Sequence, residues 1–276
     1  MQRATLLGFN HHRYLKAAGS LVVVAVLAYA LYRPPVAAYG GTWLGYVLGS
    51  VAALLVFGQL WLGYRRRRHD GGGKLQAWVS AHVYFGAALV VLATLHSGFR
   101  LGWNVHTLAY VLMLAMLATG LYGIFAYLRI PRRMTDNMGE DSFEDLLLNI
   151  ADLDQRAREH ALHLPDEMGV IAMQAVEQTS IGGNVFRQLS GRHPDCPTHA
   201  AVRLLHEPAG QLDAAQAAHR RELYSIMLRK ESLLIRARQD VAFRARLEFW
   251  LYLHAPLAVA TVTALVAHIV ATLVYR

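Results

Sequence analysis

Four histidines lie in two long apolar stretches of the chain and are spaced identically in both. His82 and His96 belong to residues 75–98, and His254 and His268 belong to residues 249–275. In each stretch the two histidines are fourteen positions apart, and neither stretch contains Asp, Glu, Lys or Arg. An ionisable side chain is costly in an apolar segment, so its recurrence at one spacing in two such segments indicates a functional site.

The spacing of these histidines suits the ligation of haem iron. Fourteen residues make just under four helical turns, which places two histidines on one face about 21 Å apart along the axis. Neutral imidazole is a good iron ligand, and an iron with two axial ligands takes one from each side of the haem. We therefore expect two haems, one held by His82 and His254 and the other by His96 and His268. The alternative is that the four imidazoles only bond to neighbouring helices.

This pattern resembles the haem-bearing helix pair of dihaem b-type membrane cytochromes. That group includes cytochrome b of quinol–cytochrome c oxidoreductases and the ferric reductases and NADPH oxidases. The resemblance implies two haem b groups, exchange of electrons with the quinone pool and with a redox partner, and membership of a respiratory or photosynthetic-type complex. It covers residues 75–98 and 249–275, about a fifth of the chain.

The resemblance is incomplete in each named subgroup. The chain has no Pro-Glu-Trp-Tyr quinol-site motif and no GxGxxG or GxxxxGK[ST] loop, so it shows neither the outer quinol site of cytochrome b nor a flavin or nicotinamide domain. Five-helix dihaem subunits of respiratory complexes match it better in span number and size. The interpretation is an electron-transfer subunit of an oxidoreductase complex; the alternatives are a ferric-reductase-like carrier and a membrane sensor, transporter or scaffold without haem.

The composition is that of a membrane protein. Apolar residues make up 55% of the 276 positions and charged residues only 17%, whereas about 25% are charged in a soluble domain. The formal charge of +8 is then explained by arginines that flank membrane spans, so we expect a lipid bilayer and not nucleic acid as partner. The single cysteine, Cys196, excludes a disulfide within the chain and an all-cysteine iron–sulfur cluster.

Five apolar segments are long enough, or nearly so, to cross a bilayer of about 30 Å. They are residues 17–32, 41–64, 75–98, 101–128 and 249–275. Pro34 and Pro35 end the first segment. The alternative for residues 1–38 is a signal peptide with Val36-Ala37-Ala38 as its cleavage site.

The arginines predict the orientation of these spans. Arg65–Arg68 and the arginines at 129–133 follow the second and fourth spans, whereas Arg100 alone lies in the loop between the third and fourth. By the positive-inside rule, the N-terminus and residues 131–247 face the cytoplasm of a bacterial inner membrane, and the C-terminus faces the periplasm. The two histidine-bearing spans are then parallel. The pair His82 and His254 lies near the cytoplasm, and the pair His96 and His268 near the outer face.

Residues 131–247 differ from the rest of the chain, because they are charged and contain most of its prolines. We expect three domains: four spans in residues 1–130, a small all-helical cytoplasmic insert in residues 131–247, and the fifth span in residues 248–276. The chain has no site that could accept a hydride, so we expect the insert to dock a redox partner. The alternatives are that it braces the bundle or drives self-association.

Helical periodicity is clear in the insert, and we find no strand pattern. Helices are expected over residues 142–163, with Ser142 at the start, and over residues 166–179. From Leu212 to Pro256 there is neither proline nor glycine, which predicts one long helix running into the fifth span.

Three further features are ambiguous in the sequence. His106, at the outer start of the fourth span, is either an interfacial histidine or a donor to a quinone or propionate. Gly49 and Gly63, again fourteen apart, permit close packing of a helix or of a haem. The segment His193–His199, HPDCPTH, contains metal-ligand residue types, but its spacing matches no zinc pattern and its two prolines predict a plain loop.

Overall fold

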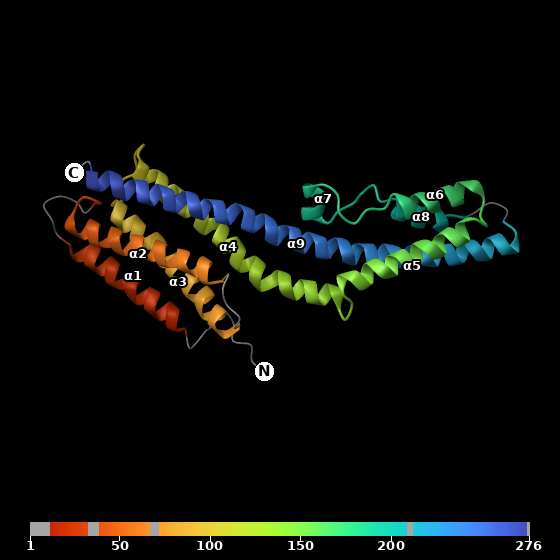
Figure 1. Cartoon of the computed structure of the whole chain (residues 1–276), viewed down its shortest axis with the longest axis horizontal. Coiled ribbons are helices and arrows are strands. Elements are labelled where there is room, and N and C mark those ends of the chain that lie inside the picture. Colours follow the sequence, from red (N-terminus) through yellow and green to blue (C-terminus); the bar gives the residue numbers. More distant parts are fainter. Residues whose placement is uncertain (1–11, 33–38, 67–71, 209–211, 275–276) are drawn as a thin grey trace. The chain divides into compact units, whose positions relative to one another are not determined.

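The computed structural model describes residues 12–32, 39–66, 72–208 and 212–274, without the side chains of 62–66, 72–76 and 166. Within these ranges all regular structure is helical (Figure 1). Five helices are long and apolar enough to cross a membrane, and short helices lie between them in the sequence. The predicted all-α class with five transmembrane helices is confirmed, and the chain is a multi-pass membrane protein.

The chain forms two compact units. The first contains the residues up to Leu121 and those from Leu253 onward, and the second contains Tyr122–Tyr252. Two helices, α4 (Val105–Met138) and α9 (Ala214–Val274), contribute to both units.

The first unit is a bundle of apolar helices in which α3 (Gly72–Ser97) packs against α1 (Arg13–Leu31) and α2 (Trp43–Arg66). The first part of α4, up to Leu121, and the last part of α9, from Leu253, complete it. The buried side chains of α2 recur every fourth residue, at Leu44, Leu48, Ala52 and Val56, and pack against leucines 89, 92 and 95 of α3. Other faces of these helices expose large apolar side chains, as expected for surfaces that contact lipid.

The second unit is built on the first part of α9. Its other helices are α5 (Phe143–Ala161), α6 (Asp166–Glu177), α7 (Val185–Ser190) and α8 (Pro197–His206). The core joins Leu146 and Leu153 of α5 to Leu223 and Met227 of α9. At its centre the buried Lys230 ammonium group donates hydrogen bonds to Asp154 and, at 2.7 Å, to the Ala175 carbonyl. Both partners satisfy a charge that would otherwise be costly to bury.

Two predicted helices and the long helix of this unit are confirmed. The hydroxyl of Ser142 accepts from the Asp145 amide at 3.0 Å, while the Asp145 carboxylate accepts from the Ser142 amide at 2.8 Å, which is a capping box at the start of α5. The long helix extends from Ala214 through Pro256 to Val274.

One helix is longer than the span it contains, and one expectation needs correction. The fourth span, expected to end at residue 128, belongs to a helix that continues through Pro131 to Met138 and ends at Gly139, where φ is +60°. The plain loop expected over residues 193–199 is wrong for its last three, because α8 begins at Pro197. Proline suits the first turn of a helix, where its missing N–H would have no intrahelical partner. Pro34, Pro35, the cleavage motif at 36–38 and Arg67–Arg68 lie outside the described residues.

Candidate functional site

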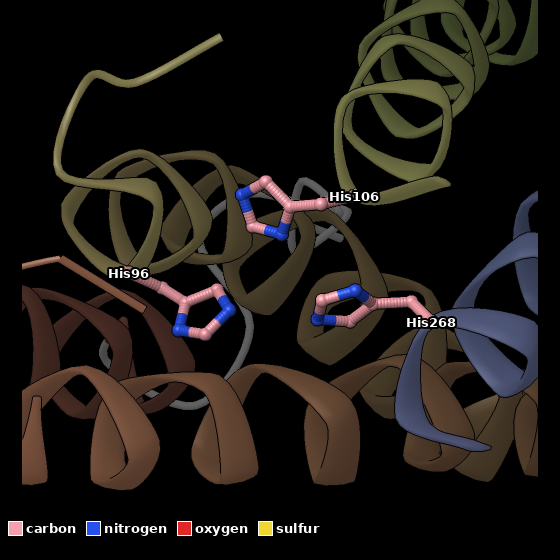
Figure 2. Close-up of side chains that lie close together, drawn as sticks. All are labelled: His96, His106 and His268. Atoms are coloured by element: carbon pink, nitrogen blue, oxygen red, sulfur yellow. The ribbon is translucent and has the colours of Figure 1, made fainter. Parts of the chain in front are cut away.

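Three imidazoles converge at one end of the first unit (Figure 2). They belong to His96 of α3, His106 of α4 and His268 of α9, and all three are half-buried. One ring nitrogen of each lies within 4.8 Å of the others. The ring centres are 5.3 Å apart for His96 and His106, 6.1 Å for His96 and His268, and 4.9 Å for His106 and His268. This outer cluster is a set of nitrogen ligands able to surround one metal.

A tight turn brings the first two of these histidines together. After α3 ends, Gly98 and Phe99 both adopt positive φ, at +57° and +59°. The side chain of Asn104 then accepts from the Thr107 amide at 2.9 Å and caps the start of α4. His96, in the last turn of α3, and His106, in the first turn of α4, therefore face the same space.

The contacts of His96 fix which of its nitrogens is free. Its Nδ1 lies 2.8 Å from the Gly45 carbonyl oxygen, which can only accept, so Nδ1 carries the proton and Nε2 has a free lone pair. A backbone carbonyl on the second ring nitrogen is the usual way in which a ligating histidine is oriented.

Gly49 of α2 and Gly40, which precedes α2, make room for this ring. A Cβ atom at Gly49 would lie 2.6 Å from Cε1 of His96, and one at Gly40 would lie 3.4 Å from it. The close approach predicted for Gly49 is therefore to an imidazole. The side-chain environment of Gly63 lies outside the described residues.

A cavity of about 550 Å³ adjoins the outer cluster and is bounded by α2, α3, α4 and α9 of the first unit. This volume is within the range of about 300–1,000 Å³ that is usual for ligand sites. Its walls are mainly apolar, with Leu89, Met113 and Leu265 among them, whereas Arg100 and Asn104 supply polar groups. The Arg100 guanidinium lies 4.8 Å from the centre of the Tyr39 ring. The cavity thus combines apolar walls with a cation that can meet an anionic group.

The other two histidines also lie in the first unit, on α3 and α9. The Thr119 hydroxyl donates to the Met116 carbonyl at 2.7 Å and lies 2.8 Å from Nδ1 of His254. These contacts hold the His254 ring against α4. Gly120 stands beside this ring, where a Cβ would be 3.6 Å from Cε1.

His82 has an unsatisfied ring nitrogen. Its Nδ1 atom is buried and has no hydrogen-bond partner among the described residues. The His82 carbonyl accepts from Gln59 Nε2 at 3.2 Å. A buried imidazole nitrogen without a partner is costly, and a metal ligand bond would remove that cost.

Haem b fits these residues in several respects, and one residue opposes it. The unsatisfied nitrogen of His82, the free Nε2 atom of His96, the glycines against two of the rings and the apolar cavity all suit bis-imidazole ligation. His106 opposes it at the outer level, because its ring stands beside the line that joins His96 to His268. A haem between His96 and His268 would occupy the position of the His106 ring, so the His106 side chain would have to adopt another conformation for the outer haem to bind.

The four histidines named from the sequence therefore all lie in the first unit, and the rings of His96 and His268 lie 6.1 Å apart. The participation of His106 was missed. The available clue was its distance of ten residues from His96 across a turn containing Gly98 and Gly102, since a short hairpin of helices brings its two ends together.

Residues 193–199 form no metal-ligand cluster within the described part of the chain. Cys196 instead accepts from the Arg238 guanidinium at 3.3 Å. Burial raises the pKa of this thiol, but the His199 amide and Arg238 together bring the pKa below its usual value. Cys196 is buried, so its role in this unit is structural.

In comparisons with known proteins, no family model, curated protein or solved structure matches the chain.

Proposed function

We propose that the chain is a dihaem b-type membrane cytochrome that carries electrons across the bilayer. The observation that carries the proposal is that the two histidines of α3 are matched, at one spacing, by the two of α9. His96 and His268 meet with ring centres 6.1 Å apart. Two imidazoles on opposite sides of one metal, with metal–nitrogen bonds of about 2.0–2.1 Å, would have ring centres about 6.4 Å apart.

In this proposal His82 and His254 hold the inner haem, and His96 and His268 hold the outer one. Bound haem would supply the one-electron redox chemistry, and the protein would orient the ligands, exclude water and supply charge. The Gly45 carbonyl accepts the Nδ1 proton of His96 and would leave its Nε2 for the iron, and the Thr119 hydroxyl lies 2.8 Å from Nδ1 of His254. The leucines and Met113 of the cavity exclude water, which affects the redox potential. Arg100 offers positive charge to a propionate.

The partners follow from the same proposal. Electrons pass between the quinone pool and a redox partner that docks on residues 131–247, within a respiratory or photosynthetic-type complex. The arginines at 129–133 support a cytoplasmic location of that segment in a bacterial inner membrane, with a periplasmic C-terminus. A reporter enzyme that is active only outside the cytoplasm, inserted at Gly182, should be inactive; activity would reverse the orientation.

A second function is favoured by the position of His106. Three imidazoles on one metal ion, at about 2.0–2.1 Å and in tetrahedral or trigonal geometry, have ring centres roughly 5–5.5 Å apart. The three observed separations, 4.9, 5.3 and 6.1 Å, lie around that value. The outer cluster would then bind an ion such as Zn²⁺ or Cu²⁺, and the chain would be a metal-binding transporter or sensor.

The deciding experiment is a reduced-minus-oxidised visible spectrum of the purified protein, combined with elemental analysis for iron, zinc and copper. The dihaem proposal requires the sharp bands of low-spin haem b and two irons per chain. Zinc or copper with no haem band would establish the second function instead. Protein made with added haem precursor should be used, so that a low haem content is not caused by poor supply.

A further inference from the structure

The second unit contains a cationic groove that no haem or histidine chemistry uses. It has a volume of about 600 Å³ and lies between the end of α4, the end of α7 and the middle of α9. Its lining includes three arginines and a single carboxylate. The charged and amide residues are Arg133, Asp136, Asn137, Arg192, Gln239 and Arg246.

Hydrogen bonds hold the α4 wall of this groove. Asn137 donates its side-chain amide to the Arg236 carbonyl of α9 at 2.8 Å, and Arg236 returns a bond to the Asn137 carbonyl at 3.0 Å. A second bond from Arg236 reaches the Met138 carbonyl at 2.6 Å. The C-terminal end of α4, where Arg133 precedes Met138 by five residues, is thereby fixed against α9.

The opposite wall is held by a close backbone approach. At Gly191, the residue that ends α7, φ is +67° and a Cβ atom would lie 3.3 Å from the Ala242 side chain of α9. Arg246 donates from Nε to the Leu189 carbonyl at 2.9 Å. These contacts place Arg192, which follows Gly191 in the sequence, at the edge of the groove.

Two of the three guanidinium groups have no partner of their own. Among the described residues, no carboxylate forms an ion pair with Arg133 or Arg192, and neither side chain donates a hydrogen bond. A guanidinium presents paired N–H donors that match the oxygens of a phosphate group, and the amides of Asn137 and Gln239 add neutral donors. The groove is therefore complementary to a phosphate anion.

Apolar segments on both sides of the groove indicate where that phosphate comes from. On α4, the exposed Phe125 and Leu128 precede Arg133 by eight and five residues, and on α9 the exposed Phe249 and Tyr252 follow Arg246 by three and six residues. Basic and aromatic side chains at such positions mark the level of lipid headgroups. The arginines of the groove thus stand where two membrane helices leave the bilayer.

We propose that this groove binds the headgroup phosphate of an anionic phospholipid. Arg133, Arg192 and Arg246 contact the phosphate, and Asp136 accepts a hydrogen bond from a hydroxyl of the headgroup, as phosphatidylglycerol provides. The inference does not depend on the proposed electron transfer, because none of these residues belongs to the histidine site.

The test is lipid binding by the full-length protein, purified in detergent, stripped of lipid and titrated with phosphatidylglycerol under native mass spectrometry. The variants are Arg133→Gln and Arg192→Gln, and the matched control is Arg132→Gln, which removes the neighbouring charge of α4 outside the groove. Loss of a charge-assisted pair is expected to weaken binding about tenfold in each groove variant and to leave the control unchanged. Unchanged thermal unfolding of the lipid-free variants shows that they are folded, and Arg192→Glu, in an exposed loop, gives a stronger second variant.

Three outcomes overturn the proposal. Equal weakening by Arg132→Gln would mean that the headgroup is attracted by interfacial charge and not by the groove. Equal binding of phosphatidylcholine would remove the preference for an anionic lipid. Full competition by millimolar inorganic phosphate would assign the groove to a soluble phosphate compound. The lipid site is supported if the wild type and Arg132→Gln bind phosphatidylglycerol equally and the groove variants bind it more weakly.

Discussion

The imidazole rings of His96 and His268 lie 6.1 Å apart, centre to centre, although they belong to helices from opposite ends of the chain. Each occupies the second position of a histidine pair with a spacing of fourteen residues. If α3 and α9 run parallel, the proximity of His96 and His268 implies that His82 and His254, the first histidines of the two pairs, also lie at one level. The two levels can therefore be tested separately.

Single substitutions should remove the haems level by level. His82→Ala and His254→Ala are each expected to leave one haem per chain, and the same haem in both cases, because either change removes one of two axial ligands. His96→Ala and His268→Ala should remove the other. Redox titration of the remaining haem identifies it by its potential. A shared spectrum for His82→Ala and His268→Ala would refute the assignment of levels.

His106→Ala separates the two functions proposed for the outer cluster. If His96 and His268 hold a haem, removal of a ring that stands beside them should leave two haems per chain. If the three histidines hold one metal ion, the same change should weaken Zn²⁺ or Cu²⁺ binding by more than about tenfold, since the loss of second-shell partners alone costs 10–100-fold. Haem content and metal affinity are measured on the same preparation.

The close contact between Gly49 and His96 gives a third prediction. Gly49→Ala places a methyl group 2.6 Å from Cε1 of the imidazole, so the ring or α2 has to move. Overpacking of this kind costs about 1–3 kcal/mol. We expect a lowered occupancy or an altered potential of the outer haem, with the inner haem unaffected. Gly58→Ala on the same helix is the control, because nothing lies within 4 Å of its added Cβ.

The spacing of the four histidines can be found in the sequence, whereas the turn that brings His106 beside His96 cannot. The apolar stretches and their fourteen-residue spacing are properties of helices, whose geometry is regular, so they predict that histidines gather on one face. His106 joins the cluster through the backbone of a turn, in which Phe99 takes a positive φ that no periodicity reveals. Pro197 was misjudged because the effect of a proline depends on its position in the helix.

The capping box of α5 predicts a pH-dependent stability of the second unit. Hydrogen bonds from the Ser142 side chain and backbone lower the pKa of Asp145 below its ordinary value. Its contribution to stability is therefore present above the unfolded pKa of about 3.9 and is lost as the pH falls through the lower folded value. Ser142→Ala should cost about 1 kcal/mol near neutral pH. Hydrogen exchange of the α5 amides measures both effects, and an unchanged exchange rate in Ser142→Ala would contradict them.

The last prediction concerns the second unit as the docking surface for a redox partner. Its helices share one core, in which Leu146 and Leu153 cover Leu223 and Met227 of α9, so deletion of residues 140–210 would expose an apolar face and confuse loss of docking with misfolding. Substitutions of exposed side chains avoid this difficulty. Phe186 is 83% exposed on α7 and Leu162 is 81% exposed after α5, and large apolar side chains exposed to this degree are typical of contact sites.

Phe186→Ser and Leu162→Ser should therefore leave both haems in place and slow electron transfer from the native donor in membranes. The effect is expected at subsaturating donor concentration, because a weaker complex raises the donor concentration required for half-maximal electron transfer. The haems themselves are unchanged. Arg203→Gln, on the exposed surface of α8, serves as a control for general surface change. If the haems persist and transfer keeps its wild-type rate in both serine variants and in their combination, the partner docks elsewhere, and the core formed with α9 is the unit's main contribution.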